Sequence, residues 1–99
     1  MKYIFHPEAL EEYLSAISYY SDINPRLAES FIKAFETGVE NIIMFPRAGS
    51  IVEENIRRHV ISRFPLGIYY CVGDNCISIY AVMHMSRHPE YWKKRRKRS

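Results

Sequence analysis

The chain has 99 residues, of which 47% are hydrophobic and 14% aromatic, and its formal net charge is +3. A chain of this length forms one domain with a single core, and its apolar content excludes a wholly disordered protein. No apolar run approaches the roughly 20 residues that a membrane span requires, so we expect a cytoplasmic protein without membrane segments.

A short strand and an amphipathic helix open the chain. The strand formers Tyr3, Ile4 and Phe5 lie within Lys2–His6, and Pro7 ends this run. Pro7 also suits the first turn of a helix, where acidic side chains interact favourably with the helix dipole. Apolar residues then recur every three or four positions, which predicts a core-facing stripe made of Leu10, Tyr13, Leu14, Ile17 and Tyr20.

A second, longer helix begins at Pro25 and ends near Phe45–Pro46. Asn24 supplies a side chain that can cap the helix, and Pro25 presets its first turn. Because the connection between the helices is short, we expect an antiparallel helical hairpin. The predicted core stripe of the second helix consists of Ala28, Phe31, Ile32, Phe35, Val39, Ile42 and Ile43.

After residues 46–49 the apolar period changes from helical to alternating. We expect strands at residues 56–61, 66–72 and 76–83, and the turn at residues 73–75 joins the last two as a hairpin. The predicted fold is therefore α+β, with the order β-α-α-β-β-β and the helical hairpin on one face of a small antiparallel sheet.

The alternation also predicts which residues share a face of the sheet. The face opposite the helices would stay free to engage a macromolecule. It would carry Tyr69, Ser78 and Tyr80 beside an arginine of the strand expected at residues 56–61. The helices should cover the more aliphatic face, which consists of Leu66, Ile68, Tyr70, Val72, Ile77, Ile79, Ala81 and Met83.

The end of the chain is strongly basic. Residues 87–99 hold seven of the 14 Lys and Arg residues and one acid, which leaves a net charge of −3 on residues 1–86. We expect Pro89 to start a last short helical turn near the end of the chain. About residues 93–99 should form a flexible basic tail of the single domain at residues 1–99, and this tail would attract any polyanion in a salt-dependent way.

The order of elements, together with several short motifs, resembles the RelE/ParE superfamily of small toxins from type II toxin–antitoxin modules. Each motif is weak alone, but the ordered set covers nearly the whole chain and is most similar to the ParE-like branch. The motifs are Ala9–Glu12, Pro25–Phe31, Phe45–Pro46, Arg57, Arg63–Pro65, Ile68–Tyr70, Ala81–His84 and Arg87–Trp92. The resemblance also implies that residues 84–92 form the closing element of the fold, at the rim of the open sheet face.

The resemblance implies one of two activities. ParE-like toxins inhibit DNA gyrase by binding, whereas RelE-like toxins cut messenger RNA on the ribosome without a metal, and a cognate antitoxin neutralises both kinds. We expect a ParE-like gyrase inhibitor that performs no chemistry of its own. A RelE-like endoribonuclease is the alternative, and an inactive family member that binds only its antitoxin is the third possibility.

A metal-independent ribonuclease needs cations at the phosphate and groups that transfer protons. Histidine has a pKa near 6.5 that suits proton transfer, arginine can clamp phosphate, and tyrosine can stack on a base or donate a proton. The residues that would carry this alternative are Arg57, Arg63, His84, Arg87 and Tyr91.

Two features argue against the ribonuclease. RelE-like ribonucleases carry an arginine early in the middle meander strand, where Gly67 stands in this chain, and Glu53 and Glu54 lower the positive potential nearby. Residues 57 and 58 are neighbours on a strand, so their arginines should point to opposite faces, and either arginine could have a structural role. We expect partner or nucleic-acid binding at Arg57, Arg58, Arg87, Tyr91, Lys93, Lys94, Arg95 and Arg96.

No metal or cofactor site is expected. The four histidines do not form a ligand motif, and Cys71 and Cys76 lack the second ligand pair of a structural zinc site, so both are expected as free thiols. The chain also has no glycine-rich loop that could cradle phosphate. We therefore expect macromolecular partners rather than a small-molecule substrate.

Overall fold

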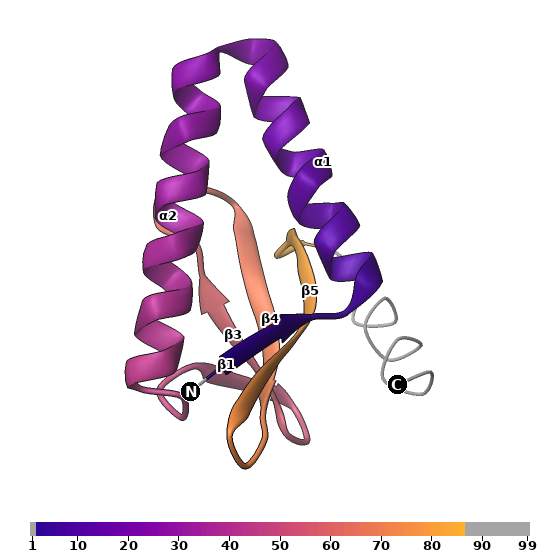
Figure 1. Cartoon of the computed structure of the whole chain (residues 1–99), viewed down its shortest axis with the longest axis vertical. Helices are drawn as coiled ribbons and strands as arrows, with labels where there is room; N and C mark the ends of the chain where they lie inside the picture. Colours follow the sequence, from indigo (N-terminus) through magenta and orange to yellow (C-terminus); the bar gives the residue numbers. More distant parts are fainter. Residues whose placement is uncertain (1, 87–99) are drawn as a thin grey trace.

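Two antiparallel helices and a five-stranded sheet make up residues 2–86, the part of the chain that this computed structural model describes (Figure 1). The predicted α+β fold is confirmed, with one strand more than the sequence predicts. The elements are β1 (Lys2–Phe5), α1 (Pro7–Ile23), α2 (Pro25–Met44), β2 (Ser50–Glu53), β3 (Ile56–Val60), β4 (Leu66–Val72) and β5 (Cys76–His84).

The sheet is mixed, with strand order β1-β5-β4-β3-β2. Strands β2 to β5 pair in antiparallel fashion, as the meander predicts, whereas β1 pairs with β5 in parallel. The expectation of a purely antiparallel sheet is therefore wrong. Strands β1 and β5 are joined through the whole helical hairpin and the other strands, and such a long connection allows parallel pairing.

Both helices begin with a side-chain cap followed by proline. The Nδ1 atom of His6 accepts a hydrogen bond from the backbone N–H of Glu8 (3.2 Å), and the Oδ1 atom of Asn24 accepts one from that of Arg26 (2.8 Å). Asn24 also ends α1: its N–H makes the last helical hydrogen bond, to the carbonyl of Tyr20, but its own backbone is extended. Neither helix in residues 2–86 is long and apolar enough to span a bilayer.

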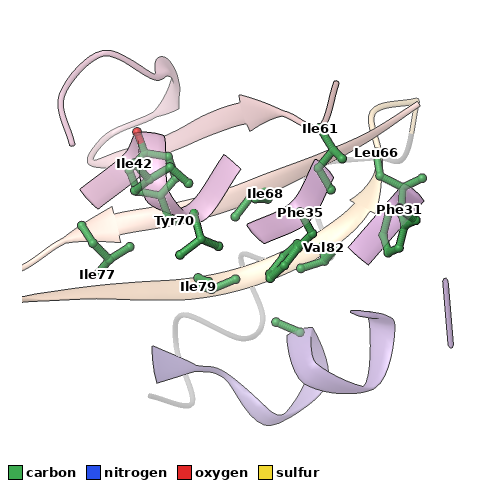
Figure 2. Packing of buried hydrophobic residues seen from close by; sticks show 12 residues of the cluster. Phe31, Phe35, Ile42, Ile61, Leu66, Ile68, Tyr70, Ile77, Ile79 and Val82 are labelled. Atoms are coloured by element: carbon green, nitrogen blue, oxygen red, sulfur yellow. The ribbon is translucent and has the colours of Figure 1, made fainter. Parts of the chain in front are cut away.

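The main core lies between the helices and one face of the sheet. Figure 2 shows its side chains gathered against β4 and β5. The predicted stripe of α2 is confirmed, because Phe31, Phe35, Val39 and Ile42 are all at most 5% exposed. The fully buried core residues from the sheet are Ile61, Ile68, Tyr70, Ile77, Ile79 and Val82.

The predicted core stripe of α1 is partly wrong. Leu10 and Leu14 are 41% and 54% exposed, whereas Ala9 is fully buried. Tyr13 is on the face of α1 that packs on the core, since the centroid of its ring lies 4.1 Å from that of the Phe35 ring. This orientation turns the small Ala9 toward the sheet and the two leucines toward solvent.

A bulge in β5 changes the predicted faces of that strand. Tyr69 pairs with Ala81 but Tyr70 pairs with Ile79, so one extra residue stands in β5 between them. The Oε1 atom of Glu12 accepts a hydrogen bond from the backbone N–H of Val82 at 3.0 Å, just beyond this bulge. Val82 therefore faces the helices, and the predicted assignment of Ala81 and Met83 to that face is wrong.

Candidate functional site

The face of the sheet opposite α1 and α2, which we call the helix-free face, carries one of the candidate binding residues of β3, Arg58. Arg58 of β3 lies directly opposite Tyr69 of β4, which lies opposite Ala81 of β5, so the three share this face. Tyr69 is 4% exposed and Met83 is 3% exposed within a second apolar cluster. Apolar side chains are therefore buried on this face as well as on the face that the helices cover.

Arg58 and Gly67 are packed together on the helix-free face. A Cβ atom on Gly67 would lie 3.0 Å from Cγ and 3.2 Å from Cδ of Arg58, so the absence of a side chain lets the arginine stem lie over β4. The Nε atom of Arg58 is buried without a hydrogen-bond partner within the structure. The sequence signal for this arrangement is a glycine inside a strand, which often marks a close approach of another group.

Arg57 has a different environment from its neighbour. Its Nη1 atom donates hydrogen bonds to the carbonyls of Arg47 (2.8 Å) and Gly49 (2.9 Å) in the loop between α2 and β2. Tyr70, directly opposite Arg57, donates from its hydroxyl to the carbonyl of Pro46 at 2.8 Å. Arg57 thus fastens a loop on the helix side of the sheet, whereas Arg58 lies on the helix-free face.

The described residues of the ribonuclease alternative do not converge. Arg57 pairs with Tyr70, but His84 pairs with Leu66, which is four residues away along β4, or about 13 Å. The Nδ1 atom of His84 accepts a hydrogen bond from the backbone N–H of Ser86 at 3.2 Å. Arg63 lies exposed in the turn between β3 and β4. Arg57 and His84 thus lie on β3 and β5, with β4 between them and an offset of four residues along it.

The remaining candidates lie outside the described residues. The expected helical turn after residue 86 and the basic tail at about residues 93–99 also lie there. The structure therefore places neither the expected closing element nor Arg87, Tyr91, Lys93, Lys94, Arg95 and Arg96.

His59 is a half-buried titratable residue that the sequence analysis did not single out. A Cβ atom on Gly38 of α2 would lie 3.1 Å from its Cδ2 atom, so α2 runs close over this imidazole. Burial lowers the pKa of His59 below its usual value of 6.5. His59 is therefore neutral at neutral pH and belongs to the packing of α2 on β3.

Within residues 2–86, no three His, Cys, Asp or Glu side chains lie close enough together to hold a metal ion. Cys71 and Cys76 are free thiols, and the Sγ atom of Cys71 accepts a hydrogen bond from the side-chain amide of Asn55 at 3.2 Å.

Comparison with known proteins gives two matches to toxin–antitoxin systems. The family described as "ParE toxin of type II toxin-antitoxin system, parDE" matches residues 3–89. A chain of the solved structure "Chromosomal ParDE TA system from P. aeruginosa" superposes with a TM-score of 0.72 at 16% identity, over 85% of this chain and 95% of that one. At such low identity the second match shows a shared fold. No curated protein matches the sequence significantly.

Proposed function

Because the chain belongs to the ParE toxin family of type II toxin–antitoxin systems, we propose that it inhibits DNA gyrase by binding and is neutralised by a cognate antitoxin. The observation that carries this proposal is the family match, which extends from residue 3 to residue 89. The toxin would trap gyrase in a complex with DNA and make or break no covalent bond itself.

The placement of the arginines supports a binding function. General acid–base cleavage of RNA requires a phosphate clamp and proton-transfer groups within hydrogen-bond reach of one substrate. The guanidinium of Arg57 is instead held by the carbonyls of Arg47 and Gly49, and His84 lies about 13 Å away along the sheet. This placement of Arg57 and His84 favours a binding role over catalysis.

The edges of the sheet support binding of an antitoxin. Strands β1 and β2 are the two edge strands, and each has unpaired backbone groups that can hydrogen bond to an added strand. Ile4 on β1 is 57% exposed, and Ile51 on β2 is 61% exposed. An extended antitoxin segment could bury such side chains while it pairs with the backbone, and its ordering on binding would make the inhibition reversible.

The test uses purified protein and purified gyrase with relaxed plasmid DNA. We expect supercoiling to decrease with increasing toxin and linear, cleaved DNA to appear after denaturation of the complex. A Phe31→Asp variant is the matched control, because a charge at this fully buried position should unfold the chain and abolish the effect. Undiminished supercoiling at saturating toxin would rule out gyrase as the target.

A parallel measurement separates the other activities. We expect sequencing of messenger RNA ends, after expression of the protein in cells, to show no new cleavage sites. Cleavage sites that disappear in His84→Ala would establish the RelE-like ribonuclease instead. Normal growth without either effect would leave a protein that binds only its antitoxin.

A further inference from the structure

A serine and a histidine meet in the turn that follows β5. The Oγ atom of Ser86 lies 2.7 Å from the Nδ1 atom of His84, which is the distance of a short hydrogen bond. Both side chains are exposed, so small molecules in solution can reach them. A hydroxyl beside an imidazole is the arrangement in which serine becomes a nucleophile, because the imidazole can take up the hydroxyl proton.

The backbone determines which of the two side chains donates. The N–H of Ser86 donates to the same Nδ1 atom of His84 at 3.2 Å, so this nitrogen carries a lone pair and the ring proton is on Nε2. The hydroxyl of Ser86 therefore donates to Nδ1 and does not accept from it. His84 is thus placed as a base toward the Oγ proton of Ser86.

The turn that carries this pair is held against the sheet. His84 is the last residue of β5, and the N–H of Met85 donates to the carbonyl of Pro65 at 2.9 Å. A Cβ atom on Gly67 would lie 3.4 Å from Cγ of Met85, so the Met85 side chain lies against β4. These contacts fix the backbone between His84 and Ser86, which keeps the hydroxyl and the imidazole together although both are exposed.

A base alone can assist only certain acyl transfers. Cleavage of an amide or an unactivated ester also needs a proton donor for the leaving group, or donors that stabilise the oxyanion. An acyl phosphate is different, because its leaving group is phosphate, a weak base that departs as an anion without a proton. A base that takes the proton of the attacking hydroxyl is then sufficient. The pair of Ser86 and His84 therefore suits acyl transfer from an acyl phosphate.

We propose that Ser86 is a site of O-acylation by acyl phosphates, with His84 as the general base. The Oγ atom of Ser86 bonds to the carbonyl carbon while Nδ1 of His84 takes the Oγ proton. The bond from this carbon to the phosphate oxygen breaks, inorganic phosphate leaves, and His84 releases the proton to water. The product is an ester directly before the basic residues 87–99. This inference goes beyond gyrase inhibition and does not depend on it.

The probe is acetyl phosphate, incubated with the full-length chain at neutral pH. Mass spectrometry of peptides taken at successive times gives the acetylation rate of each serine, and hydroxylamine distinguishes esters, which it removes, from lysine amides, which it does not. We expect Ser86 to be acetylated about 10-fold faster or more than Ser62, an exposed serine in the turn between β3 and β4.

Two histidine variants separate the base from the turn. In H84N the amide oxygen can accept the same hydrogen bond from the N–H of Ser86, but it cannot take up a proton at neutral pH. We expect acetylation of Ser86 in H84N to fall about 10-fold, to the rate of Ser62. H6N is the matched control, because the Nδ1 atom of His6 accepts an equivalent hydrogen bond from the N–H of Glu8 at the start of α1. This variant should leave the Ser86 rate unchanged.

Two results would overturn the proposal. One is an equal rate of acetylation at Ser86 and Ser62 in the wild type. The other is an H84N chain in which Ser86 reacts as fast as in the wild type, since the histidine would then have only a structural role in the turn. Thermal unfolding shows whether H84N is folded, and the comparison of the two serines in the wild type carries the test if it is not.

Discussion

Arg63 has a backbone conformation that glycine adopts at lower cost. Its φ angle is 71°, and it lies in the turn between β3 and β4. Two hydrogen bonds close this turn: the N–H of Ile61 donates to the carbonyl of Leu66, and the N–H of Phe64 donates to the carbonyl of Ile61. Placing a non-glycine residue in the left-handed region costs about 1–2 kcal/mol of stability. A glycine at that position recovers only part of this cost, because glycine also raises the entropy of the unfolded chain. The turn thus retains Arg63 despite a conformational cost.

We expect R63G to raise the free energy of unfolding by about 0.5–1 kcal/mol, because it relieves the left-handed backbone strain. Urea unfolding of the wild type and variant measures this change. R47G is the control, since Arg47 is exposed in another loop and has no positive φ, so glycine there should lower stability. An R63G chain no more stable than the wild type would show that the turn imposes no strain on this residue.

Side-chain environments were the part of the site that the sequence could not predict. The alternation along a strand correctly separates Arg57 from Arg58, because neighbouring residues point to opposite faces. It does not show that Arg57 reaches the carbonyls of the loop before β2, or that Arg58 lies over Gly67. Both contacts join residues far apart in sequence, so only the packed sheet reveals them.

At the scale of elements, the loop between α2 and β2 is fastened from two strands. Arg57 of β3 donates to the carbonyls of Arg47 and Gly49, and Tyr70 of β4 donates to that of Pro46. Gly49 fits beneath the Tyr70 hydroxyl because any Cβ atom there would collide with it. These contacts fix the point at which the chain leaves the helical hairpin and enters the sheet.

We expect R57Q to lower the free energy of unfolding by about 1–2 kcal/mol, since it removes charged hydrogen bonds to two carbonyls, one of them partly buried. Chemical denaturation gives the change, and hydrogen exchange should show faster exchange at residues 46–50. R47Q should leave both unchanged, because the loop uses only the backbone carbonyl of Arg47. If R57Q is as stable as the wild type but loses a partner, Arg57 is a binding residue instead.

Long periodic elements were predictable and short or irregular ones were not. Twenty residues of α2 repeat one apolar stripe, and the matching face is buried. Strand β2 has four residues, a bulge and no buried position, so its sequence carries little periodic signal. The bulge in β5 lies beside a hydrogen bond from Val82 to Glu12 of α1, which is 70 residues away in sequence, and no local pattern reports this contact.

Across the whole molecule, burial shifts the pKa values of one histidine and three tyrosines away from their ordinary values. Burial lowers the pKa of His59 below 6.5, and it raises the pKa values of Tyr13, Tyr20 and Tyr70 above 10.0. All four groups therefore prefer their neutral forms in the folded state. The core that joins the helices to the sheet is thus built for neutral side chains.

The sign of the pH dependence follows from these directions. Below pH 6.5 the unfolded chain binds a proton at position 59 more readily than the folded chain does, so stability falls as the pH drops toward the folded pKa. Above pH 10.0 the unfolded chain releases tyrosine protons more readily, so stability falls as the pH rises. We expect a plateau of maximal stability between these limits.

Urea unfolding midpoints measured from pH 5 to pH 11 test this profile, and H59Q isolates the contribution of the imidazole. In H59Q, stability should fall less steeply below pH 6.5, because a glutamine beneath α2 cannot gain a positive charge. An acid limb that is identical in the wild type and H59Q would show that His59 is protonated without cost, and that α2 is not held against a neutral imidazole.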